Sequence, residues 1–257
     1  MNGGLIMRTK TAQCVLDDLD QAVAAVIFGV DGVIVDTTRA SAAAWKSVLD
    51  PFLRSYAQVH RTAYVPFDVR ADYLRYMRRR PQLDGVRDFL ASRAITLPYD
   101  DLRALAVRHE EFFLGEVRKH GVSPVASTVS LVLKLHRCGA STAAVSEQCC
   151  GSELLRRAGV AEMFDVLLDG LDTPGTALPA RPDARLFREA AVRLGTSPRR
   201  TAVIEASPSG VAAARCGGFG AVIGVDPAGG ASRLGEHGAD LVIADTSELP
   251  LHERRVA

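Results

Sequence analysis

Short apolar runs alternate with longer segments of helical periodicity, and this alternation limits what the chain can fold into. The runs are bounded by turn residues and are apolar on both faces, as strands are in a parallel sheet covered by helices. They are AAVIF (24–28), STAAV (141–145), VLLDG (166–170), TAVIE (201–205), GAVIGV (220–225) and DLVIA (240–244). The pattern predicts an α/β fold whose reactive groups gather beyond the carboxyl ends of the strands.

A long interval without a convincing strand separates the first run from the second. Residues 38 to about 138 repeat an amphipathic helical pattern, so we expect a helical subdomain inserted into the sheet. Its limits are expected near Thr38 and the segment 121–127. Pro51 predicts a break or kink towards the end of the first helix of this subdomain. At 257 residues and 47% hydrophobic content, the chain can bury a sizeable core.

Charge and hydropathy argue against several classes of partner. The formal net charge is +1 without long runs of one sign, which gives no indication of nucleic-acid binding. The apolar stretches are shorter than the roughly 18 residues that cross a membrane. The segment MNGGLIMRTKTAQ lacks the apolar core of a secretion signal, so a cytoplasmic location is expected.

The cysteines indicate reduced thiols. Their number is odd and their spacing is not that of metal ligands. They are Cys14, Cys138, Cys149, Cys150 and Cys216. The neighbours Cys149 and Cys150 have two interpretations, a redox switch or ordinary thiols of a protein core, and the second is the more common.

Loops that contain several polar residues follow the expected strands, and the positions of interest include glycines and an alanine among them. They are Gly29, Asp31, Asp36 and Thr37 after the first run, Ser146 and Glu147 after the second, Glu205, Ala206, Ser207 and Gly210 near TAVIE, and Arg181 in the connection LPARPD. Acids, a hydroxyl and a cation on separate loops of one sheet suit an anion or metal site. Polar loops also occur in α/β proteins without such a site.

Four segments resemble one protein family in the correct order along nearly the whole chain. They are VIFGVDGVIVDT, AAVS, ARPDARLFREAAVRLG and AVIEASPSGVAAARCGGFGAVIGVD. They resemble the haloacid dehalogenase superfamily, and within it the β-phosphoglucomutase-like branch. The resemblance implies a Rossmann-like core with a parallel sheet, residues 1–37 and 122–257, and an inserted all-helical cap of the four-helix type, residues 38–121.

The resemblance also assigns roles, and several positions depart from them. Active members carry Asp-x-Asp-Gly in the first motif, where the first Asp attacks a phosphoryl group and the second acts as acid and base. Gly29 stands at the nucleophile position, while Asp31 stands at the acid/base position. Ser146 and Arg181 match the phosphate-binding positions, with Arg181 replacing a lysine.

The metal-binding positions also differ from those of active family members. In active members Mg²⁺ is held by the nucleophile and by acids of the last motif. Here Glu205 is retained as a vestigial metal residue and Ala206 replaces a second ligand. We therefore expect Mg²⁺ to bind weakly or not at all. Glu147 follows Ser146, and its side chain either turns away from an anion or repels it.

The expected cap differs from that of the phosphomutase branch at the positions that would contact a substrate. Ser41 stands where the phosphomutase branch has a histidine, and Gln82 where an arginine would hold a phosphosugar. Four arginines nearby offer a different phosphate contact or, more commonly, a solvated helix face. They are Arg75, Arg78, Arg79 and Arg80.

Three functional hypotheses follow. The first is a catalytically inactive or strongly impaired member of the superfamily. It would have a ligand-binding or regulatory role and bind a small phosphorylated ligand or a protein partner. The second is a Mg²⁺-dependent phosphatase or phosphosugar mutase of low or altered activity, using Asp31 or a water that Asp31 and Glu205 orient. The third is a thiol nucleophile at Cys149 or Cys150.

Each residue also has a structural interpretation. Gly29 suits any tight turn, and Asp31, Asp36 and Thr37 are typical caps of turns and helices. Trp45 is expected in the core. Glu205 is expected to make either a salt bridge at a strand end or a residual metal contact.

Overall fold

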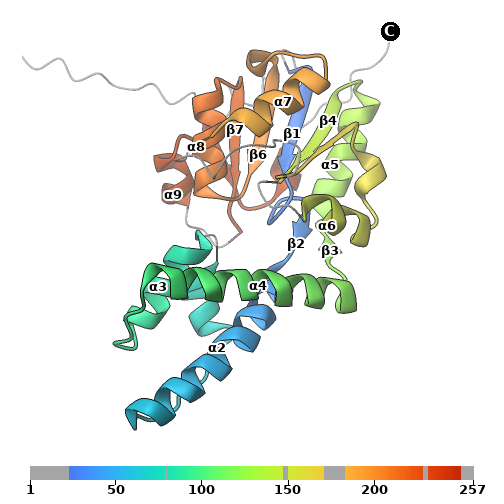
Figure 1. The fold of residues 1–257 in the computed structure, drawn as a ribbon. Helices are drawn as coiled ribbons and strands as arrows, with labels where there is room; N and C mark the ends of the chain where they lie inside the picture. Colours follow the sequence, from blue (N-terminus) through green and yellow to red (C-terminus); the bar gives the residue numbers. More distant parts are fainter. Residues whose placement is uncertain (1–22, 79, 147–149, 171–182, 228–230, 250–257) are drawn as a thin grey trace, which may run out of the picture. The chain divides into compact units, whose positions relative to one another are not determined.

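The computed structural model describes residues 23–78, 80–146, 150–170, 183–227 and 231–249 (Figure 1). The chain divides into two compact units. The first is formed within Met1–Val35 and Pro124–Ala257, and the second is Asp36–Ser123.

A parallel sheet of six strands is the centre of the first unit, and the α/β fold is thereby confirmed. The strand order is β5-β4-β1-β6-β7-β8, so β1 occupies an interior position. The strands are β1 (Ala25–Gly29), β4 (Ser141–Val145), β5 (Val166–Leu168), β6 (Thr201–Glu205), β7 (Ala221–Val225) and β8 (Leu241–Ile243). The apolar residues of the four inner strands, β1, β4, β6 and β7, are buried, as a sheet covered on both faces requires.

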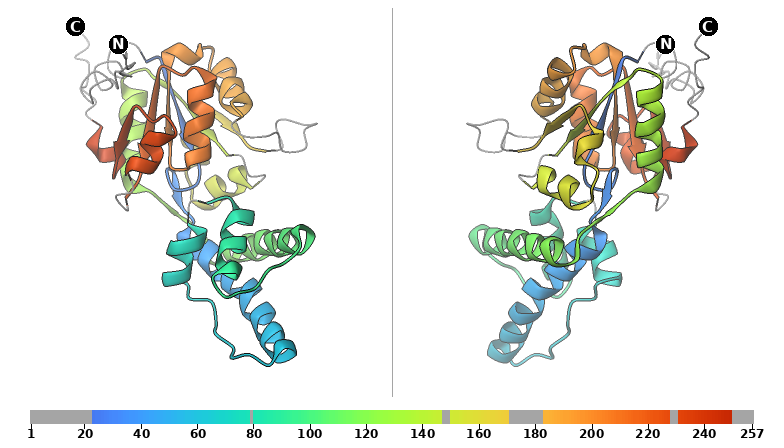
Figure 2. Two further views of the ribbon diagram at one scale, coloured as in Figure 1. Left: turned by 90° about the vertical axis from the view of Figure 1, so that its left-hand side faces the viewer. Right: turned by 90° about the vertical axis from the view of Figure 1, so that its right-hand side faces the viewer.

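Helices cover both faces of this sheet. Figure 2 shows α7 and α8 on one side of the strands and α5 on the other. The helices are α5 (Ala126–Arg137), α6 (Gly151–Arg157), α7 (Arg185–Arg193), α8 (Pro208–Gly217) and α9 (Ala231–Glu236). Phe187 of α7 and Val211 of α8 pack with Ile27 of β1 in one apolar core. This packing holds the ends of neighbouring strands in a fixed arrangement.

The second unit is mainly helical and has its own core. Its elements are α2 (Thr38–His60), the π-helix η1 (Tyr73–Met77), α3 (Gln82–Ala91) and α4 (Tyr99–His120). Trp45, Leu49 and Phe89 are buried in this core, which confirms the expectation for Trp45. The Asp36 carboxylate accepts a hydrogen bond from the Thr38 N–H, whereas the Thr37 side chain makes no cap hydrogen bond. The turn before α2 is thus held by Asp36.

The break expected at Pro51 is wrong, whereas the alternative of a kink there stays a prediction. Helix α2 continues through Pro51 to His60, and the exposed proline removes one backbone N–H donor without ending the helix. The expectation of helix alone between the first two strands is also wrong. Residues 62–68 have no regular structure, and the two-residue strands β2 (Val35–Asp36) and β3 (Ser123–Pro124) pair with each other.

The expected limits of β4 and β6 agree with the observed ones at both ends, and those of the other four strands differ by at most two residues. Gly29 is the last residue of β1, so it belongs to the strand and not to the loop that follows. Strand β5 ends at Leu168, which leaves Asp169 beyond its carboxyl end. Within the described residues, every helix is too short or too polar to cross a membrane.

Candidate functional site at the carboxyl ends of the strands

Three neighbouring strands bring Gly29, Ser146 and Glu205 to one edge of the sheet. In the register, Gly29 of β1 is paired with Val145 of β4, and Phe28 is paired with Ile204 of β6. Ser146 follows Val145 and Glu205 follows Ile204, so these two residues flank the end of β1 on opposite sides. The three positions that the sequence analysis grouped together therefore lie at the ends of adjacent strands.

Asp31 lies on a tight loop directly after β1. The loop is closed by a hydrogen bond from the Gly32 N–H to the Val35 carbonyl, 2.9 Å, and Gly32 has a φ of +75°, which favours glycine. Asp31 itself is exposed. A Cβ at Gly32 would lie 3.1 Å from the Cβ of Ala206, so this loop runs next to the end of β6.

The Glu205 carboxylate fills the space beside Gly29. A Cβ built on Gly29 would lie 2.8 Å from the Glu205 carboxyl carbon, and Oε1 would be closer still. A Cβ built on Gly210 would lie 2.6 Å from Oε2 and 2.7 Å from Oε1 of the same carboxylate. Two glycines from separate elements therefore make room for this carboxylate.

Ser207 holds the same carboxylate by one oxygen. The Ser207 N–H and its hydroxyl both donate to Oε2 of Glu205, at 2.9 and 3.0 Å. The Ser207 hydroxyl oxygen accepts from the Gly210 N–H at 3.0 Å, so Ser207 is also the N-cap of α8. Pro208 begins the helix with a fixed φ. The position of Glu205 is thus tied to the start of α8.

Ser146 lies in a tightly packed corner beside the start of α6. It is only 8% exposed, and its N–H donates to the Leu168 carbonyl at 3.0 Å. A Cβ at Gly151 would lie 3.0 Å from the Ser146 hydroxyl oxygen and 3.4 Å from the Cβ of Asp169. Asp169 is buried and accepts from the Ser152 hydroxyl at 2.8 Å.

Asp169 is a polar residue of this edge that the sequence analysis did not single out. It stands in the run VLLDG, which was assigned to a strand as a whole. The signal that could have identified it is the change from apolar residues to an acid after Leu168. Three other positions of interest, Glu147, Cys149 and Arg181, lie outside the described residues. Cys150 is buried, and the hypothesis of a thiol nucleophile or redox pair stays a prediction.

Comparison with known proteins identifies the family. The profile of a family described as "haloacid dehalogenase-like hydrolase" matches residues 23–218. The chain belongs to this haloacid dehalogenase-like family. A β-phosphoglucomutase of Mycobacterium bovis is 32% identical over 243 residues, which cover 90% of this chain and 93% of the relative. An uncharacterized glycosyl hydrolase of Mycobacterium tuberculosis is 37% identical over 233 residues, but this chain spans only 17% of its length.

Solved structures of the haloacid dehalogenase-like family share the fold. A hydrolase of the family from Deinococcus radiodurans, with bound phosphate and sodium, has a TM-score of 0.67 and 27% identity, covering 90% of this chain and 94% of that one. A β-phosphoglucomutase from Clostridium difficile has a TM-score of 0.60 at 18% identity, covering 89% and 93%, which supports the fold alone. The resemblance to the β-phosphoglucomutase-like branch is confirmed.

The Mg²⁺ that members of this family generally use does not fit the described side chains. Mg²⁺ needs closely placed oxygen ligands, usually with one or two carboxylates. Among the described residues, groups of three or more His, Cys, Asp or Glu that could hold a metal are absent. Gly29 and Ala206 carry no oxygen in their side chains, and Oε2 of Glu205 already accepts two hydrogen bonds from Ser207.

In the helical unit, Ser41 is hydrogen-bonded to a histidine of another helix. Nε2 of His109 in α4 lies 3.2 Å from the Ser41 hydroxyl and 3.3 Å from the Ser41 carbonyl oxygen. The His109 ring stacks on Trp45 with 4.2 Å between centroids, and Nδ1 has no hydrogen-bond partner in the described part of the chain. Burial lowers the pKa of His109 to about 4, against a smaller raising effect of the Ser41 carbonyl.

The other expected cap residues lie around η1 and the start of α3. Gln82 is the first residue of α3. Arg75 is exposed and lies over the ring of Tyr76, at 5.2 Å, while Arg80 pairs with Asp88 at 2.8 Å. Arg78 is half-buried. Arg79 lies outside the described residues.

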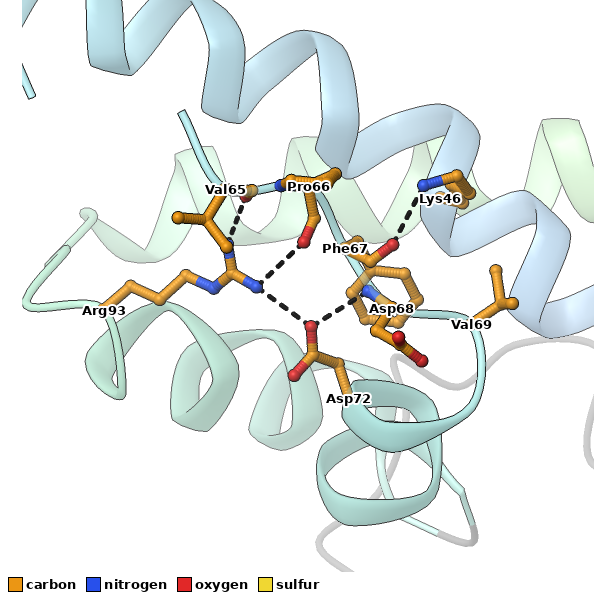
Figure 3. Close-up of a pocket in the computed structure, with 8 residues that line it drawn as sticks. All are labelled: Lys46, Val65, Pro66, Phe67, Asp68, Val69, Asp72 and Arg93. Carbon is orange, nitrogen blue, oxygen red and sulfur yellow. Dashed lines mark hydrogen bonds and ion pairs between the residues drawn. The ribbon is translucent and has the colours of Figure 1, made fainter. Parts of the chain in front are cut away.

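A cavity of about 520 Å³ lies within the helical unit (Figure 3). It is lined by Lys46, Val65, Pro66, Phe67, Asp68, Val69, Asp72 and Arg93. Arg93 donates to the carbonyls of Val65 and Pro66 and to the Asp72 carboxylate, and Lys46 donates to the Phe67 carbonyl. These polar groups form hydrogen bonds with other residues that line the cavity. We therefore interpret the cavity as part of a structural arrangement in which Arg93 and Lys46 hold the irregular segment 62–68 in place, and we call this arrangement the loop clamp.

Proposed function

We propose that this chain is a β-phosphoglucomutase-like protein that does not transfer phosphoryl groups through an aspartyl phosphate. Its proposed role is to bind a small phosphorylated ligand in a ligand-binding or regulatory capacity. The observation that carries the proposal is the end of β1. There Gly29 supplies no carboxylate, and the space of its missing side chain is filled by Glu205.

The surrounding residues support the same proposal. Ala206 offers no metal ligand beside Glu205, and the two donors of Ser207 hold the Glu205 carboxylate as a structural group. Ser146 remains at the end of β4 as a candidate phosphate contact, with Arg181 as a second candidate. Without an attacking carboxylate at position 29, the covalent route of the family is closed.

A restoration experiment tests this proposal. The wild-type chain is assayed with an aryl phosphate and phosphosugars in Mg²⁺, and its turnover is expected to equal that of Asp31→Asn. The double variant Gly29→Asp/Ala206→Asp is expected to gain about two powers of ten or more in turnover, because it regains a nucleophile and a metal ligand once the flexible end of the Glu205 side chain moves aside.

The matched control is Gly115→Asp, which adds the same side chain at an open position of α4. It should leave turnover unchanged. Wild-type turnover well above that of Asp31→Asn would contradict the proposal and favour the second candidate function.

That second candidate is a Mg²⁺-dependent hydrolase of low or altered activity that uses Asp31. It is favoured by one observation, the exposed position of Asp31 on the loop beside Ala206. Loss of a measurable wild-type activity in Asp31→Asn, with normal folding by circular dichroism, would support it.

A further inference from the structure

His109 is a buried histidine at the contact between the two longest helices of the helical unit. It lies in α4 and is only 4% exposed. Its ring stacks on Trp45 of α2, with 4.2 Å between the centroids, and on Phe113 of α4, with 6.1 Å. Trp45 and Phe113 are buried as well, so the imidazole has aromatic neighbours from both helices and little access to water.

The hydrogen bonds of His109 determine which of its nitrogens carries the proton. Nε2 lies 3.3 Å from the Ser41 carbonyl oxygen, which can only accept, so Nε2 carries the hydrogen and donates it. Nδ1 is therefore the unprotonated nitrogen, and it is buried without a hydrogen-bond partner in the described part of the chain. A second proton would have to enter at Nδ1, where a buried N–H without an acceptor is unfavourable.

Charged groups do not compensate for a proton at this place. Burial lowers the pKa of His109 to about 4, and the Ser41 carbonyl opposes this effect only in part. The charged side chains on neighbouring turns of the packed helices are Arg39 and Lys46 of α2, Asp84, Arg87 and Asp88 of α3, and Arg108, Glu110 and Glu111 of α4. They are either exposed or held in ion pairs at the surface, and among the described residues none of them shifts the pKa of His109.

We propose that the contact of His109 with Ser41 and Trp45 is a pH-sensitive latch within the helical unit, in which uptake of one proton by His109 releases α4 from α2. The imidazolium ring can be hydrated only when it leaves this contact, and burial of an unpaired charge is strongly unfavourable. The sheet of the first unit has a core of its own and stays folded when the latch opens. This inference does not depend on the proposed binding of a phosphorylated ligand.

The two states of the latch differ in proton affinity, and this difference sets the direction and size of the effect. In the open state His109 is exposed and has the ordinary pKa of 6.5, against about 4 in the closed state. Above pH 6.5 neither state takes up the proton, and the latch is closed. Between pH 6.5 and 4 only the open state does, so the equilibrium constant for opening should rise about 20-fold from pH 6 to pH 4.5.

Hydrogen exchange of the full chain at pH 6 and pH 4.5, corrected for the intrinsic pH dependence of exchange, tests the inference. Amides of α4 around His109 and of α2 around Trp45 are expected to exchange about 20-fold faster at pH 4.5, while those of β1 and β6 change by less than about twofold. His109→Phe keeps an aromatic ring that cannot take up a proton and should lose the acceleration. His120→Gln removes a more exposed histidine of the same helix and should keep it.

Trp45 provides a second readout, because it is the only tryptophan of the chain. Its emission should shift to the red, and its quenching by acrylamide should increase, between pH 6 and pH 4.5. This measurement needs the wild type alone, so it decides the matter even if His109→Phe fails to fold. Constant exchange in α4, constant Trp45 emission, the same acceleration in His109→Phe, or equal acceleration in the strands of the sheet overturns the inference.

Discussion

At the scale of single residues, Gly29 and Glu205 depend on each other. Gly29→Ala would place a methyl group against the Glu205 carboxylate, and we expect the free energy of unfolding to fall by about 1–2 kcal/mol, because the carboxylate must leave its two hydrogen bonds with Ser207. In a Glu205→Ala background the same change should cost close to nothing, and urea denaturation of the four proteins measures this coupling. Equal costs in both backgrounds would show that the two positions are independent.

His109 predicts a dependence of stability on pH. Its pKa is about 4 in the folded chain, below the ordinary 6.5, because burial disfavours the charged ring. Above pH 6.5 its contribution is complete. Between pH 6.5 and 4 the unfolded chain binds a proton that the folded chain does not, so the free energy of unfolding falls by about 3 kcal/mol over this range, with no further loss from this group below pH 4.

Urea denaturation at pH 7 and pH 4.5 measures the effect of His109. His109→Phe keeps an aromatic ring beside Trp45 and should show a smaller loss of stability on acidification than the wild type. His120 is more exposed, and His120→Gln should lose as much stability on acidification as the wild type. The same pH dependence in His109→Phe and wild type would remove His109 as the cause.

At the scale of elements, the irregular segment after α2 is held by side chains from both of its neighbours. Asp50 of α2 accepts from the Phe67 N–H at 2.8 Å. Arg93, after α3, donates to two carbonyls of the segment and to Asp72, as Figure 3 shows. Arg93 also lies 4.5 Å from the centre of the Phe89 ring. The segment therefore has defined partners although it lacks regular structure.

Arg93→Ala is expected to lower the free energy of unfolding by about 2 kcal/mol. It removes hydrogen bonds from a side chain that is only 19% exposed and leaves the Asp72 carboxylate without this cation. Arg87→Ala, whose side chain is 58% exposed, should change stability by less than about 0.5 kcal/mol. Thermal or urea unfolding compares the two, and similar small effects would argue against the loop clamp.

The elements also show where sequence patterns succeed and fail. Apolar runs located the sheet strands to within one or two residues, because burial on both faces selects the same residues that favour strands. The pattern failed at Pro51, where an exposed face of α2 tolerates the proline, and at the two-residue strands β2 and β3, which are too short to leave a periodicity.

At the scale of the whole molecule, the strand order decides which side chains of the first unit meet. The sequence places Gly29, Ser146 and Glu205 after different strands, and only the order β4-β1-β6 makes these strands neighbours. The pairing of Ser41 with His109 likewise depends on α2 packing against α4 in the second unit. Neither relation leaves a local signal, because the partners come from distant parts of the chain.

The fold class, the helical insertion, the family resemblance and the absence of an aspartate at position 29 could all be predicted from the sequence. These properties rest on local periodicity and on residue identity, which are visible without any contact. The sequence gives no sign that a carboxylate nevertheless lies beside Gly29. In the folded chain Glu205 supplies it from the neighbouring strand, and Ser207 and the open space at Gly210 keep it in place. The physical reason is that this space is made by packing β1, β6 and α8 together.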